Sequence, residues 1–116
     1  MKSKEALIKK MKEFISVTDK GLEEKTVDVK EMSLSNLRDC LIGIGTILDE
    51  DFELNTYILS VGAGVANRNS AVVATQLSDN KLYFLGYAKE GLINQHTAKK
   101  AIDRIIKVVE KYIYTE

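Results

Sequence analysis

A row of cationic side chains near the C-terminus is the most suggestive candidate for binding chemistry in this sequence. Its members follow one another at intervals of four, three and four residues, namely Lys100, Arg104, Lys107 and Lys111. Side chains with this spacing are neighbours on one face of a helix. Because Arg104 can donate two parallel hydrogen bonds to a phosphate, the row suits an anionic ligand or an acidic partner. The alternative is a solvated face that pairs with acidic residues such as those at 49–51.

Several residues that precede this basic row in the sequence could bind a flat ligand. Phe84 can stack on a planar ring beside the open space at Gly86, and the Asn94 amide offers both a donor and an acceptor. Either Arg104 or Arg68 would then neutralise a phosphate. We therefore predict a site for an anionic, nucleotide-like ligand formed by Phe84, Gly86, Asn94, Arg104 and Arg68. Core packing is the alternative for Phe84, and helix capping is the alternative for Asn94.

Catalytic and metal-binding patterns are absent from the sequence. The only histidine, His96, lies at the start of the predicted last helix, and no nucleophile or carboxylate is identifiable as its catalytic partner. The only cysteine, Cys40, lies on an apolar helical stripe, which favours a buried thiol over a nucleophile. One histidine and one cysteine do not supply a metal-ligand spacing. We therefore expect a protein that is not an enzyme and that holds neither a metal nor a cofactor.

Length and composition indicate a single globular domain spanning residues 1–116. The chain is 45% hydrophobic and 29% charged, and its 17 basic and 17 acidic residues cancel. Zero net charge argues against a general nucleic-acid binder. A single cysteine suits a reducing compartment. Residues 1–5 lack the apolar run of a secretory signal, and no apolar run is long enough to cross a membrane, so we expect a cytoplasmic location.

The residues between Leu54 and Ala88 predict three strands that are apolar on both faces. Strands that are buried on one side alternate apolar and polar residues, whereas these barely alternate. The expected strands cover 52–66, 71–77 and 82–88, and the short polar turns between them make the neighbours antiparallel. A further edge strand is expected at 26–29. Both faces of this sheet therefore need a cover.

Three amphipathic helices are expected to supply that cover. The first runs from Ser3 to about Val17 and the last from Asn94 to about Ile113. Residues 35–48 carry a helical stripe, which favours a helix with its cap at Ser35 or Asn36. Against a helix stand two glycines and several β-branched residues within the same segment, so the alternative is a short helix running into a strand near Leu41.

These elements predict an α+β fold. We expect a three- to four-stranded antiparallel meander, packed by two N-terminal helices and one long C-terminal helix. Two helices would cover one face of the sheet and the Asn94 helix part of the other, leaving surface for a ligand or a second copy. The predicted function is to bind or sequester an anionic, nucleotide-like small ligand at an interface of a homo-oligomer. The alternative is a protein–protein interaction module, such as an adaptor, inhibitor or immunity-type protein, acting through an apolar sheet face.

Overall fold

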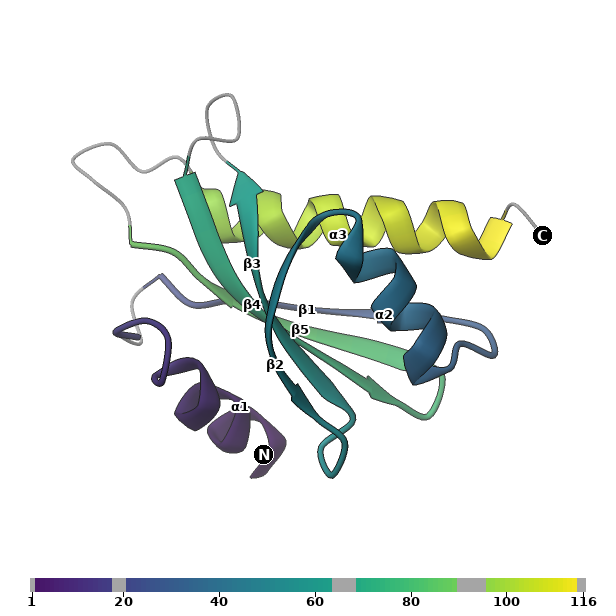
Figure 1. The fold of residues 1–116 in the computed structure, drawn as a ribbon, viewed down its shortest axis with the longest axis horizontal. Coiled ribbons are helices and arrows are strands. Elements are labelled where there is room, and N and C mark those ends of the chain that lie inside the picture. The colour runs from purple at the N-terminus through teal and green to yellow at the C-terminus, as the bar shows by residue number, and fades with distance from the viewer. Residues whose placement is uncertain (1, 18–20, 64–68, 90–95, 115–116) are drawn as a thin grey trace.

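The chain folds as five strands and three helices within the residues that the computed structural model describes, which are 2–17, 21–63, 69–89 and 96–114. All strand pairs are antiparallel, and the spatial order of the strands is β1-β5-β4-β3-β2 (Figure 1). The elements follow in the order α1 (Lys2–Met11), β1 (Glu23–Asp28), α2 (Leu34–Ile42), β2 (Gly45–Asp51), β3 (Thr56–Ala63), β4 (Asn69–Ser78), β5 (Lys81–Tyr87) and α3 (Thr97–Tyr114). The α+β class is as predicted, but the sheet has five strands rather than three or four.

The segment 35–48 is not one helix, so our preferred prediction for it is wrong and the alternative is right. The helix α2 begins after Ser33, whose side-chain oxygen accepts a hydrogen bond from the Asn36 amide at 3.1 Å, and it ends at Ile42. β2 then starts at Gly45, where an added Cβ would lie 2.2 Å from the Ser60 carbonyl oxygen. Only glycine permits so close an approach of β2 to β3. The β-branched residues after it favour the strand.

Other boundaries differ from the expected ones by a few residues. α1 stops at Met11 rather than near Val17, and residues 52–55 form a turn before β3 instead of opening it. The edge strand expected at 26–29 exists as β1 but begins at Glu23. α3 begins at Thr97, and the predicted start at Asn94 lies outside the described residues.

The two faces of the sheet are covered unequally. α2 and α3 pack together on one face, over a cluster that includes Leu59, Val73 and Phe84. α1 alone lies on the other face, over Ile58, Val72, Ala74, Leu85 and Tyr87 (Figure 1). The prediction that the two N-terminal helices share one face and the last helix lies on the other is therefore wrong. α2 lies between β1 and β2 in the chain, and this connection runs over the same side of the sheet as α3.

The helix α1 is held to the sheet by two apolar side chains and an ion-pair cluster. Leu7 and Met11, four residues apart, are fully buried against the sheet. Lys10 lies between them and places its ammonium nitrogen 3.0 Å from an Asp49 oxygen and 2.9 Å from an Asp51 oxygen. Asp51 also accepts hydrogen bonds from two backbone amides of the following turn. Lys10 therefore ties α1 to the end of β2.

The buried hydroxyl groups of two threonines lead to a prediction about the free energy of unfolding. Thr75 in β4 is fully buried, and its hydroxyl has no hydrogen-bond partner among the described residues. Burying an unsatisfied hydroxyl destabilises a fold, so Thr75→Val is expected to raise the free energy of unfolding by about 1 kcal/mol. Urea denaturation followed by circular dichroism measures this change.

Thr56 is the matched control, because it is equally buried but its hydroxyl donates to the Leu54 carbonyl at 2.8 Å. Thr56→Val removes a satisfied hydrogen bond and is expected to lower the free energy of unfolding by about 1 kcal/mol. Equal destabilisation by both substitutions would show that the Thr75 hydroxyl is satisfied in solution.

Candidate functional site

The structure places Phe84 and Gly86 beneath α3 rather than on an open surface. The Phe84 side chain is fully buried in the core cluster between the sheet and the two helices. An added Cβ on Gly86 would lie 3.1 Å from Ile102 Cδ1 and 3.6 Å from Ala98 Cβ, so α3 rests directly on this glycine. Core packing, the alternative given for Phe84, is therefore its observed position, and its ring is not accessible for stacking on a ligand.

The remaining predicted ligand-binding residues do not form a site within the described part of the chain. Arg104 is half-buried and donates a hydrogen bond to the carbonyl of Gly62 at the end of β3. Its guanidinium is thus already engaged with the protein's own backbone. Asn94 and Arg68 lie outside the described residues.

The acidic residues 49–51 do not pair with the basic row of α3, as the solvated-face alternative proposed. Asp49 and Asp51 pair with Lys10, and Glu50 pairs with Arg38 at 2.8 Å. The described side chains include no cluster of His, Cys, Asp and Glu arranged to hold a metal ion. Cys40 is buried as expected, and burial raises the pKa of its thiol.

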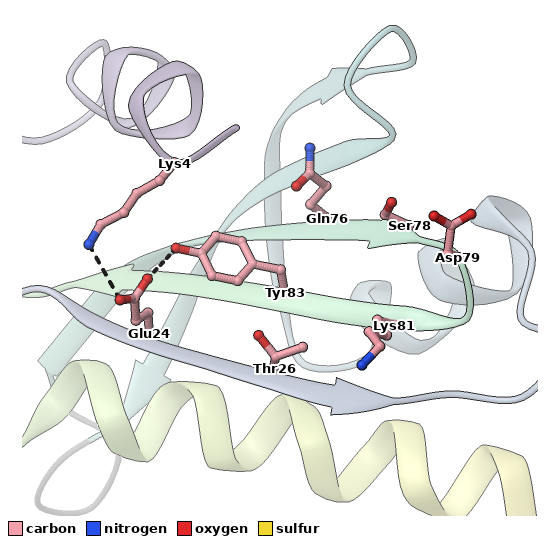
Figure 2. Close-up of a pocket in the computed structure, with 8 residues that line it drawn as sticks. All are labelled: Lys4, Glu24, Thr26, Gln76, Ser78, Asp79, Lys81 and Tyr83. Atoms are coloured by element: carbon pink, nitrogen blue, oxygen red, sulfur yellow. Dashed lines mark hydrogen bonds and ion pairs between the residues drawn. The ribbon is translucent and has the colours of Figure 1, made fainter. Parts of the chain in front are cut away.

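An open groove lies on the α1 side of the sheet, where the sequence analysis placed no site. It encloses about 530 Å³, and we call it the α1 groove (Figure 2). It is lined by Lys4 from α1, Glu24 and Thr26 from β1, Gln76 and Ser78 from β4, Asp79 from the turn, and Lys81 and Tyr83 from β5.

The α1 groove forms because the helix is shorter than the strands it covers. α1 has ten residues and packs over the apolar part of this face. Beyond it, the same face of β4 and β5 continues with Gln76, Ser78, Lys81 and Tyr83, because alternate residues of a strand share a face. The register pairs Thr26 of β1 with Tyr83 of β5 and so adds the third strand to the floor.

Three side chains interact at the α1 end of the groove. The Tyr83 hydroxyl donates to one oxygen of Glu24, and the Lys4 ammonium lies 3.3 Å from the other (Figure 2). The Tyr83 hydroxyl, and to a smaller extent Lys4, lower the pKa of Glu24 below its ordinary value of 4.5. Burial, followed by the hydrogen bond to Glu24, raises the pKa of Tyr83. Glu24 is therefore an ionised acceptor and Tyr83 a neutral phenol at neutral pH.

The rest of the groove offers donors and acceptors with no excess of charge. The Gln76 amide nitrogen donates to the Leu54 carbonyl at 3.0 Å, which fixes the amide beside the Tyr83 ring. Thr26 adds a hydroxyl group on the β1 side, and Ser78 adds one beside Asp79 at the turn end. Two lysines and two carboxylates line the groove, so their formal charges cancel.

Sequence reasoning missed this groove because its floor depends on a strand register. The polar residues at the end of β4 and the start of β5 are visible in the sequence, but the expected edge strand at 26–29 omits Glu24. Only the pairing of β1 with β5 brings Glu24 and Tyr83 together across a separation of 59 residues.

Comparison of the chain with known protein families, with curated proteins and with solved structures finds no match. Within the described residues, no helix is long and apolar enough to span a bilayer.

The hydrogen bond from Tyr83 to Glu24 leads to a prediction about the pKa of the Glu24 carboxyl. Tyr83→Phe removes the donor that lowers the pKa of Glu24, so that pKa is expected to rise toward 4.5. Carboxyl-detected NMR titration measures it. Since the folded pKa lies below the unfolded one, Glu24 stabilises the fold above pH 4.5, and this stabilisation is lost as the pH falls through the folded pKa. Tyr83→Phe should weaken this acid dependence.

Tyr112→Phe is the control, because Tyr112 lies on α3, on the opposite side of the sheet. An unchanged Glu24 pKa in the Tyr83→Phe variant would contradict the hydrogen bond as its main cause.

Proposed function

We propose that this protein is a non-catalytic binding protein that takes a small, planar, nucleoside-like ligand in the α1 groove. The observation that carries the proposal is the Tyr83 ring, half-buried on the groove floor beside a carboxylate that already accepts two hydrogen bonds. An aromatic face with polar groups around it is the usual arrangement for binding a flat polar molecule.

The ring of Tyr83 is held in position before any ligand arrives. It belongs to β5, which is paired on both sides, and its hydroxyl is hydrogen-bonded to Glu24. A rigid aromatic group loses little conformational entropy on binding, so more of the stacking energy contributes to affinity. Stacking of a base on an aromatic side chain contributes roughly 1–3 kcal/mol.

Hydrogen-bonding groups around the ring suit the edges of such a ligand. Glu24 accepts from ring N–H groups, and the Gln76 amide and the Thr26 and Ser78 hydroxyls both donate and accept. A groove of about 530 Å³ lies in the range of small-molecule sites, roughly 300–1,000 Å³.

The charge of the groove refines the ligand expected from the sequence. Lys4 pairs with Glu24, and Lys81 lies 3.5 Å from an Asp28 oxygen, so each lysine has an acidic neighbour. This balance supports a ligand with little net charge, such as a nucleoside or a monophosphate whose phosphate meets the exposed Lys81, over a polyphosphate. Cytoplasmic location and homo-oligomerisation remain parts of the proposal.

The alternative function, an interaction module acting through an apolar sheet face, has less support. The apolar residues of the central strands lie under α1 on one face and under α2 and α3 on the other. Of the exposed large apolar side chains in the described residues, only Leu48 belongs to the sheet, and it lies on the edge strand β2.

Isothermal titration calorimetry with the four nucleosides and their monophosphates tests the proposal. We expect at least one to bind, and Tyr83→Ala to weaken it by about tenfold or more, because stacking is lost. Tyr83→Phe should retain most of the stacking. Tyr112→Ala, on the far side of the sheet, serves as the control and should leave affinity unchanged. Absence of binding by all eight compounds at millimolar concentration would refute this ligand class.

A further inference from the structure

We propose that the β2 edge of the sheet binds the β2 edge of a second copy of this chain. The two strands run antiparallel about a two-fold axis at Leu48 and join the two sheets into one. This interface lies at the opposite edge of the sheet from β1, so the proposal is independent of the α1 groove.

β2 is an open edge strand. It pairs with β3 on one side and is the last strand in the sheet order, so the backbone groups on its other side have no strand partner among the described residues (Figure 1). Such an edge is a template for pairing with another chain unless charges or other devices block it.

The charges that would block this edge are neutralised within the chain. Residues 49–51 are all acidic, yet Lys10 pairs with Asp49 and Asp51, and Arg38 pairs with Glu50. A carboxylate that is paired with a nearby cation repels an approaching strand less than an unpaired carboxylate does. The acidic end of β2 is therefore compatible with close approach.

Exposed apolar side chains gather along the same segment. The described residues include four exposed large hydrophobic side chains, and three of them lie within 42–52. These are Ile42, Leu48 and Phe52, with 51%, 37% and 66% of their surface exposed. Leu48 is also the extra residue of a β-bulge between Ile47 and Asp49, so it has no partner residue on β3.

The order of these residues fits a second copy better than an unrelated partner. A two-fold axis at Leu48 sets residue 48+n of one copy beside residue 48−n of the other. Leu48 then meets Leu48 of the second copy, and Phe52 lies beside Ile44. The acids at 49–51 face Ile47, Thr46 and Gly45, so no acid opposes another acid. The edge can thus match apolar residues with apolar residues at Leu48 and at Phe52 and Ile44, and it sets no acid beside another acid.

Sedimentation equilibrium of the full chain tests the proposal. We expect a concentration-dependent dimer of twice the 13.0 kDa chain mass. Leu48→Lys sets two like charges against each other on the axis and should raise the dimer dissociation constant by about tenfold or more. Phe14→Lys makes the same change at an exposed apolar residue outside the β2 segment and should leave that constant unchanged.

A mixing experiment separates loss of pairing from loss of folding. Leu48→Lys and Leu48→Glu should each be monomeric alone and should form a heterodimer when mixed, because opposite charges then meet on the axis. Phe52→Lys, in an exposed turn, provides a second variant that should weaken the dimer. A wild-type chain that stays monomeric up to its solubility limit would overturn the proposal, as would a dimer that neither Leu48→Lys nor Phe52→Lys weakens.

Discussion

The burial of both faces of β3, β4 and β5 is the constraint on which the rest of this structure depends. Each of these strands carries apolar side chains on two sides, so the sheet is stable only between two covering layers. One layer, made of α2 and the 18-residue α3, covers its face extensively. The other layer is α1 alone, and its ten residues leave the polar end of the strands open. The α1 groove is therefore a direct result of unequal cover.

Ion pairs act together with this apolar constraint, because they fix the position of α1 on the sheet. Two buried side chains alone would let α1 slide along the sheet, whereas Lys10 and Lys4 each bind carboxylates on opposite edge strands. These bonds are partly exposed and individually weak, so their role is to set position more than to supply stability. The same contacts shape both proposed surfaces, because Lys4 forms one wall of the groove and Lys10 neutralises the β2 edge.

Local patterns in the sequence predict the fold class and most of the helices and strands. The position of the candidate site depends instead on pairing between strands that are distant in the sequence. Phe84 and Tyr83 are neighbours in one strand and therefore face opposite sides of the sheet, but the sequence alone leaves open which side a helix covers. The stripe at 35–48 suggested a helix because Ile44 and Ile47 match helical spacing. Contact between Gly45 and the Ser60 carbonyl, which no local pattern reveals, makes that segment a strand instead. Glu24 and Tyr83 meet only through the β1–β5 register.

The two edges of the sheet differ in ways that point to different roles. β1 carries charged residues at four of its six positions, and α3 flanks it, with Lys25 lying 3.6 Å from an Asp103 oxygen. Charged side chains and a flanking helix both discourage strand addition there. β2 packs against α2, its acids are paired with Lys10 and Arg38, and its exposed side chains include the apolar Leu48. A two-fold dimer through β2 would leave only the charged β1 edges exposed, so the proposed assembly would close at two copies.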